Sequence, residues 1–327
     1  MDYIYDYKKL NTLTTFLKGV KKQKLSHAYL FLSSDKNTNE AAAILFASSL
    51  VCAHKDAPCF ECSTCLKVIN RTGVDVFTYP KKNSIVVEDI KDIIENAATK
   101  PLEFSKKIFV LNNIDEATIS AQNKLLKTLE EPEQDVIFIL TATSIKAVLP
   151  TIVSRARTIL LPKSEVDEIE AILKEKESDA NRIAFSAEVS EGSLGRALDI
   201  LNDETYFSTY NFVLDMLINM KTTKDVINYS SVINKNTKFI NLYLEQLEKV
   251  FRDVLMIKAG TSEVVFNKHS LNTLTKISEG YSQLALSKIV EKILEHKKML
   301  KFNANPTGVI DTLLIGILEV KYKWREK

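Results

Sequence analysis

The sequence predicts an α/β domain with a mainly parallel sheet, followed by helical domains. Two observations indicate this division. In residues 1–162, short apolar runs alternate with segments of helical periodicity, which is the pattern of βαβ units. Beyond Pro162 the strand pattern ends, and apolar residues recur at helical spacing. The chain has 327 residues, which is too long for one compact core and fits two or three domains.

Five short apolar runs are the candidate strands of this sheet. They are HAYLFL (27–32), DVFTYP (75–80), KIFVLN (107–112), DVIFIL (135–140) and RTILLP (157–162). Between them, apolar residues over 86–97 mark one face of a helix. Leu125, Leu126 and Leu129 mark another helix, which Pro132 ends.

The rest of the chain predicts two helical domains. Residues 163–205 contain three short predicted helices around Gly192, so we expect a small helical domain there. Residues 206–327 are predicted to be helical throughout, with one long apolar stripe that stops at Gly260. His296 lies on a second stripe, and we expect it to be a packed, hydrogen-bonded core residue rather than a ligand.

Composition and charge exclude some classes of protein. The chain has 44 basic and 42 acidic residues, a net charge of +2, whereas proteins that bind DNA by themselves usually carry a basic excess. No apolar run approaches the roughly 20 residues of a membrane span, and the N-terminus lacks the apolar segment of a signal peptide. We therefore expect a cytoplasmic protein without a membrane partner.

All four cysteines fall between positions 52 and 65. Cys52, Cys59, Cys62 and Cys65 have the spacing C-x6-C-x2-C-x2-C, and such clustering in a reducing compartment indicates a metal rather than disulfides. Four thiolates complete the tetrahedral coordination of zinc and leave no position open for a reacting water. We predict a structural zinc module at residues 52–65, with His54 as an alternative ligand.

The stretch LFLSSDKNTNEAAAILFA (30–47) has the strand–loop–helix order of a phosphate-binding P-loop without its key residues. A P-loop needs glycines, a lysine for the phosphate charge and a Ser or Thr for Mg²⁺. Here Ser33 replaces the first glycine, Asn39 stands at the lysine position and Glu40 at the hydroxyl position. We expect Lys36 to precede the helix, where it could not replace the lysine. The loop is interpreted as a degenerate nucleotide site.

The second half of such a site is also altered. An ATPase carries an acidic pair at the end of its third strand to orient Mg²⁺ and water, and here Asn112 ends the KIFVLN run and Asn113 follows it. Asp115 and Glu116 lie three positions further on, so a shifted acidic pair is the alternative. We expect a chain that binds no ATP and has no catalytic activity of its own.

Several motifs carry a resemblance to one family. NKLLKTLEEPEQDVIFILTATS (123–144), VLPTIVSRAR (148–157), SHAYLFLSS (26–34) and the cysteine cluster together resemble the AAA+ clamp-loader subunits of bacterial DNA polymerase III, and among them the delta-prime type. The resemblance implies an AAA+ domain over 1–162, a helical lid over 163–205 and an all-α collar over 206–327.

The resemblance also implies roles for single residues. In clamp loaders the arginine of a Ser-Arg-Cys motif enters the ATP site of the neighbouring subunit, and Ser154 and Arg155 occupy its first two positions here, with Ala156 in place of the cysteine. Arg157 is the competing arginine. Arg196 occupies the sensor-2 position and Thr143 the sensor-1 position, and we expect neither to have a functional role in this chain.

The function implied is that of a non-ATPase stator subunit. Its expected partners are the gamma/tau ATPase subunits and the delta subunit, and through the assembly the sliding clamp and primer-template DNA during DNA replication. One alternative is a divergent gamma/tau-type ATPase, which would itself bind ATP. Another is a zinc-containing nucleic-acid-binding module that works alone.

Overall fold

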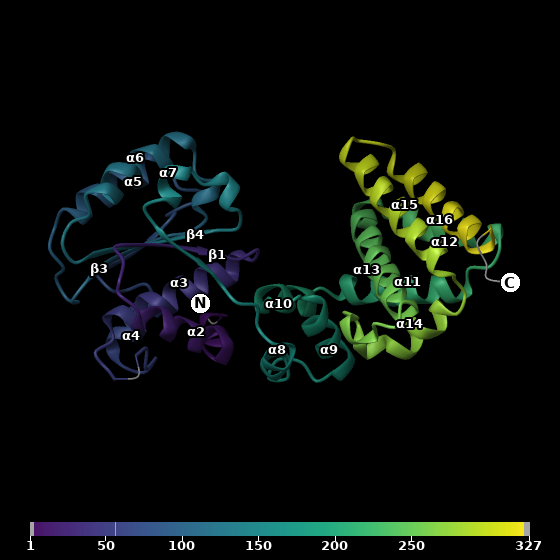
Figure 1. The fold of residues 1–327 in the computed structure, drawn as a ribbon, viewed down its shortest axis with the longest axis horizontal. Helices are drawn as coiled ribbons and strands as arrows, with labels where there is room; N and C mark the ends of the chain where they lie inside the picture. The colour runs from purple at the N-terminus through teal and green to yellow at the C-terminus, as the bar shows by residue number, and fades with distance from the viewer. Residues whose placement is uncertain (1–2, 56, 324–327) are drawn as a thin grey trace. The chain divides into compact units, whose positions relative to one another are not determined.

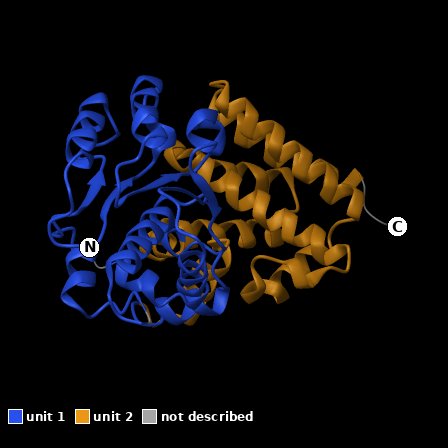
Figure 2. Ribbon diagram, turned by 60° about the vertical axis from the view of Figure 1, so that its left-hand side comes forward, with its two compact units in different colours: residues 1–176, 192–196 blue, residues 177–191, 197–327 orange. Residues whose placement is uncertain are grey.

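A computed structural model describes residues 3–55 and 57–323. The chain forms two compact units, Met1–Lys176 with Gly192–Arg196 (unit 1) and Glu177–Glu191 with Ala197–Lys327 (unit 2) (Figure 2). Each unit has a hydrophobic core of its own. The division into three domains at residues 162 and 205 remains a prediction.

Unit 1 is built on a five-stranded sheet in which the strand order is β2-β3-β4-β1-β5 and every pairing is parallel. The strands are β1 (Ala28–Leu32), β2 (Val76–Tyr79), β3 (Lys107–Leu111), β4 (Val136–Ala142) and β5 (Arg157–Leu160). All five predicted strands are confirmed, with ends that differ by at most two residues. β3 and β4 are buried along their whole length, which explains their continuous apolar sequences.

Helices cover both faces of this sheet (Figure 1). The helices of unit 1 are α1 (Tyr3–Lys8), α2 (Asn11–Lys22), α3 (Lys36–Val51), α4 (Ser63–Ile69), α5 (Val87–Ala97), α6 (Ile119–Glu130), α7 (Pro150–Val153) and α8 (Val166–Leu173), with short 3-10 turns at Ile114–Glu116 and Ile145–Ala147. α5, α6 and α7 share one core with alternate strand residues such as Phe109 and Phe138. The predicted helices over 86–97 and around Leu125 are therefore confirmed as α5 and α6.

The other face of the sheet is covered by α3. The ring of Phe46 lies 4.9 Å from the ring of Tyr29 and 5.4 Å from that of Phe31, measured between centroids. α1, α2 and α4 pack on α3 in turn, so α3 is buried on most sides, including its first turns at Thr38 and Asn39. The loop that resembles a P-loop therefore leads into a buried helix.

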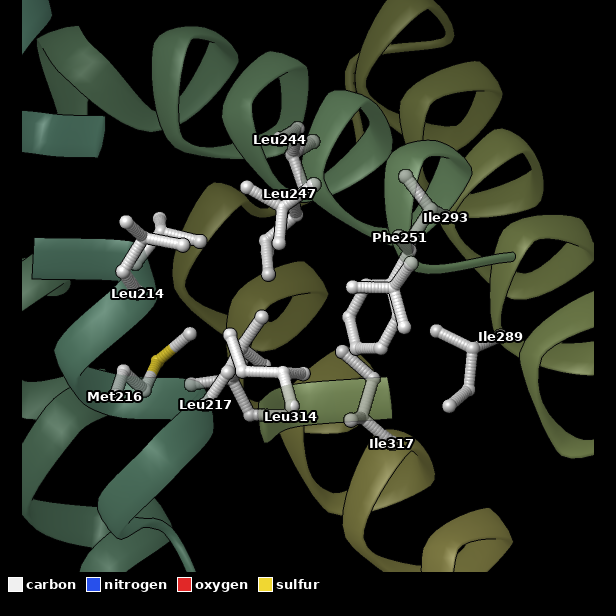
Figure 3. Close-up of a cluster of buried hydrophobic side chains, with 14 of the residues drawn as sticks. Leu214, Met216, Leu217, Leu244, Leu247, Phe251, Ile289, Ile293, Leu314 and Ile317 are labelled. Atoms are coloured by element: carbon white, nitrogen blue, oxygen red, sulfur yellow. The ribbon is translucent and has the colours of Figure 1, made fainter. Parts of the chain in front are cut away.

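The described residues of unit 2 form helices and 3-10 turns and no strand. Its helices are α9 (Ala180–Val189), α11 (Glu204–Asn219), α12 (Thr223–Asn234), α13 (Ile240–Lys258), α14 (Leu271–Ser278), α15 (Gln283–Lys301) and α16 (Pro306–Lys323), with 3-10 turns at Thr237–Phe239, Ser262–Val264 and Lys268–Ser270; α10 (Leu194–Asn202) has residues in both units. Side chains from α11, α13, α15 and α16 meet in its core, among them Leu217, Leu247, Phe251, Ile289 and Ile317 (Figure 3).

The predicted apolar stripes are the buried faces of α13 and α15. His296 is 8% exposed, its Nδ1 lies 2.7 Å from the carbonyl oxygen of Lys292, and its Nε2 lies 3.2 Å from Oγ1 of Thr312. The prediction of a packed, hydrogen-bonded histidine is confirmed. None of the described helices combines the length and the apolar character that crossing a membrane requires.

Candidate functional site

Asp35 caps the N-terminus of α3, at the place where a P-loop helix receives phosphate. Its carboxylate accepts hydrogen bonds from the backbone N–H groups of Asn37 and Thr38, at 3.1 and 3.0 Å, and from Oγ1 of Thr38 at 2.5 Å. These N–H groups have no partner within the helix and carry the positive end of its dipole. A negative charge from the chain itself thus occupies the helix end.

Two residues distant in sequence also donate to this carboxylate. Tyr7 of α1 donates its hydroxyl to Asp35 at 3.3 Å, and Ser193, just before α10, donates at 2.8 Å. Burial raises the pKa of Tyr7, so its hydroxyl stays a donor. Gly195 lies so close that an added Cβ would come within 2.9 Å of Asn37 and Tyr7 side-chain atoms. The N-terminus of α3 is thus in contact with residues from two distant segments of the chain.

Asn39, at the lysine position, ties two backbone segments together. Its side chain is fully buried, and its Nδ2 donates to the carbonyl oxygens of Ser33 at 3.0 Å and Ala142 at 2.9 Å. The amide therefore links the loop after β1 to the end of β4. Glu40 forms an ion pair with Arg71.

Lys36 was expected before the helix, and this expectation is wrong because Lys36 is the first residue of α3. Asp35 is the N-cap, so α3 begins at the next residue and Lys36 lies in its first turn. Its ammonium forms an ion pair with Glu116. Lys36 is thus engaged by a neighbouring carboxylate.

The residues after β3 form a hydrogen-bonded turn. Asn113 has a left-handed backbone with φ of 55°, and its N–H donates to Oγ1 of Thr141 at 3.0 Å. The same hydroxyl lies 3.4 Å from Oδ1 of Asn112. One carboxylate oxygen of Asp115 accepts from the N–H and hydroxyl of Thr143, at 2.9 and 2.8 Å, and from the N–H of Ser144. The alternative acidic pair is thus bound to the end of β4 and to Lys36.

Arg155 follows α7 with its side chain 34% exposed. Its Nη1 donates to the carbonyl oxygen of Thr151 at 2.9 Å and lies 3.4 Å from Oγ of Ser154, while Nη2 lies 2.6 Å from Oε1 of Glu130. The competing arginine, Arg157, begins β5 and contacts the side chain of Gln23. The two arginines therefore have separate surroundings.

The four cysteines converge as their spacing predicted. All four sulfur atoms lie within 4.8 Å of one another, and the Cys59 sulfur lies 3.8 Å from that of Cys52 and 3.9 Å from that of Cys65. Zinc–sulfur bonds of about 2.3 Å in a tetrahedron separate the sulfurs by about 3.8 Å. Hydrogen bonds from the backbone N–H groups of Glu61 and Cys62 lower the pKa of Cys59 to about 6, whereas burial raises the pKa of Cys65. The donor set fits a four-sulfur metal site, and His54 is not part of it.

Comparison with known proteins shows which proteins this chain resembles. Residues 8–165 match the family described as "DNA polymerase III, delta subunit". The DNA polymerase III subunit delta' of Bacillus subtilis is 25% identical over 308 residues, which cover 92% of this chain and 93% of that one. This chain is similar to the DNA polymerase III clamp-loader subunits. The resemblance drawn from its motifs is thereby confirmed.

Other clamp-loader proteins are similar as well. The tau subunit of Bacillus subtilis is 24% identical over 337 residues, which cover 94% of this chain but only 60% of tau. A gamma subunit-related protein from Thermotoga maritima has a solved structure that covers 95% of this chain and all of that chain, with 16% identity and a TM-score of 0.46. The fold itself, a parallel α/β sheet followed by helices, agrees with the fold class that the sequence predicts.

Sequence reasoning missed the residues that fill the degenerate loop. Asp35 carries a signal that could have been used, since an aspartate directly before a helical segment is a typical N-cap. Tyr7 and Ser193 carry no such signal, because they are 28 and 158 residues away from Asp35.

Proposed function

We propose that this chain is a delta-prime-type subunit of the clamp loader, which does not hydrolyse ATP and supplies Arg155 to the ATP site of a neighbouring subunit. The carrying observation is the carboxylate of Asp35 at the N-terminus of α3. This carboxylate accepts hydrogen bonds from the N–H groups that would otherwise bind a phosphate, and its negative charge would repel a phosphate. Asn39 and Glu40 add no cation where a P-loop has its lysine.

Arg155 has the chemistry of an arginine finger. A guanidinium stays protonated and presents a rigid set of donors to phosphate oxygens. Fingers of this kind accelerate phosphoryl transfer by roughly 10³–10⁵-fold where they act. Arg155 is partly exposed, directly follows Ser154, and lies in the segment that resembles the clamp-loader motif. Ala156, in the place of the cysteine, bears no charge and does not alter this role.

The other parts of the proposal follow from the same relationship. The partners would be the gamma/tau ATPase subunits and the delta subunit, in a cytoplasmic assembly that loads the sliding clamp on primer-template DNA. Residues 206–327 would form the collar that joins the subunits, and residues 163–205 the lid. The four cysteines would hold a structural zinc ion, because four thiolates leave no coordination position for chemistry.

A divergent gamma/tau-type ATPase is the second candidate. The observation that favours it is the similarity to tau along 94% of this chain. It requires that the isolated chain binds ATP and Mg²⁺, which equilibrium dialysis with labelled ATP measures directly. Saturable binding at micromolar ATP would favour this candidate and contradict the proposal.

Replacing Arg155 tests the finger role. In a loader reconstituted with the neighbouring ATPase subunits, Arg155→Ala should lower the DNA-stimulated ATP turnover by at least tenfold while the assembly stays intact by gel filtration. Arg157→Ala is the matched control, since it removes an arginine two positions away that contacts Gln23. If the loader with Arg155→Ala turns over ATP as fast as the loader with Arg157→Ala, Arg155 is not an arginine finger.

A further inference from the structure

Helix α6 fixes the side chain of Arg155, and we propose that Glu130 is the positioning residue of its guanidinium group. This inference rests on the proposed function, because it concerns how Arg155 is presented to the ATP of the neighbouring subunit. Glu130 would touch neither ATP nor the reacting atoms, and would act only through the orientation of Arg155.

The geometry holds both terminal nitrogens of the guanidinium. Oε1 of Glu130 lies 2.6 Å from Nη2, and the carbonyl oxygen of Thr151 accepts from Nη1 at 2.9 Å. Two contacts on different nitrogens define the plane of the group as well as its position. A guanidinium has five N–H donors, so N–H groups beyond these two contacts can face an anion.

The backbone segments that carry Glu130 and Arg155 are anchored in one core. Leu129, next to Glu130, is 1% exposed and belongs to the same core as Ile152 of α7 and Ala156. This shared core sets the distance between the backbones that carry the two charged side chains. A catalytic group must be held to a fraction of an ångström, and this core anchors the turn that carries Arg155 on both sides, through Ile152 and Ala156.

A buried amide strengthens the connection between α6 and the segment that carries Arg155. Gln122 of α6 is 2% exposed. Its Nε2 donates to the carbonyl oxygen of Ala147 at 3.2 Å, and its Oε1 accepts from the N–H of Leu149 at 2.9 Å. The start of α7 is therefore bonded to one end of α6, and Arg155 is bound to the other end.

The exposure of the Glu130–Arg155 ion pair indicates that the pair orients Arg155 rather than stabilises the fold. The side chains of Arg155 and Glu130 are 34% and 46% exposed, and exposed ion pairs contribute little to folding. Without Glu130, the long arginine side chain would sample other rotamers and present its donors in the right place for a smaller fraction of the time. The opposite effect, a carboxylate that restrains Arg155 from reaching phosphate, would make the loss of Glu130 activating.

The test compares two neighbouring glutamates in the reconstituted loader. Glu130→Gln should lower kcat for ATP about three- to thirtyfold with KM for ATP unchanged. Glu130→Asp keeps the charge on a shorter side chain, so its kcat should lie between that of Glu130→Gln and that of the native chain. Glu131→Gln is the matched control, because Glu131 is the exposed next residue at the end of α6. It should leave kcat unchanged.

A second measurement separates this inference from the proposed function. In the isolated chain, the ¹⁵N side-chain NMR signals of Arg155 should shift and lose protection from solvent exchange in Glu130→Gln but not in Glu131→Gln. If Arg155→Ala leaves ATP turnover unchanged, the proposed function fails. If Arg155→Ala lowers turnover while Glu130→Gln is as fast as Glu131→Gln or faster than the native loader, only the positioning role is overturned.

Discussion

Removing the carboxylate of Asp35 should destabilise unit 1 far more than the loss of an ordinary helix cap. In Asp35→Ala, the N–H groups of Asn37 and Thr38 lose their acceptor. The hydroxyls of Tyr7 and Ser193 lose the same acceptor. Tyr7 is fully buried, so its hydroxyl has no ready access to water.

The expected magnitude follows from these contacts. Loss of an N-cap costs about 1 kcal/mol, and a hydrogen bond to a charged group contributes about 1.5–3 kcal/mol. The hydroxyls of Tyr7 and Thr38 lie 3.3 Å apart and retain each other as partners, while the half-buried Ser193 can turn toward water. We therefore expect a loss of about 2–4 kcal/mol in the free energy of unfolding of unit 1.

Native-state hydrogen exchange in urea is the suitable assay, because it reports on β1 and β4 separately from unit 2. Thr118→Ala is the matched control in the same unit, since Thr118 caps α6 through a single hydrogen bond to the N–H of Ala121. Its expected cost is about 1 kcal/mol. If Asp35→Ala costs no more than Thr118→Ala, Asp35 is an ordinary cap and the argument for an internally filled site is wrong.

Two more predictions concern the metal module and acid stability. The purified chain should hold one zinc ion, as measured by elemental mass spectrometry. Cys62→Ser should release the ion and remove protection from hydrogen exchange at residues 52–65, while the sheet stays protected. A Cys62→Ser variant that keeps its zinc would contradict the predicted four-cysteine zinc site. At Asp75, burial opposes ionisation, but hydrogen bonds from the N–H groups of residues 102–104 prevail and lower its pKa. Because the pKa of Asp75 is lower in the folded state, its ionised carboxylate stabilises the fold at pH values above the unfolded-state pKa of about 3.9. This stabilisation is lost as the pH falls through the folded-state pKa. The stability deficit of Asp75→Asn at pH 7 should therefore shrink toward pH 3, and a deficit that stays constant would refute the linkage.

The strands and the convergence of the four cysteines were predictable because their signals are local. Each strand is a continuous apolar run, since a parallel sheet covered by helices buries both faces. The cysteines lie so close in sequence that a short turn brings their sulfurs together. Asn39 and Glu40 were recognisable because they replace known residue types at fixed positions of a motif.

The contents of the site were not predictable, because they depend on tertiary contacts. Asn39 donates to Ala142, which is 103 residues away, and no pattern around either residue encodes that pairing. The position of Lys36 was misjudged for a local reason, since the cap at Asp35 was overlooked. The ion pair between Glu130 and Arg155 depends on how α6 and α7 pack against the same core.

The amide of Asn39 limits which residues position 39 can accept. Because it joins the loop after β1 to the end of β4, a substitution by lysine would break two buried hydrogen bonds. Asp35, Tyr7 and Ser193 would still obstruct the pocket. A nucleotide site at this loop would thus require several coordinated substitutions, and any one of them alone would remove stabilising contacts.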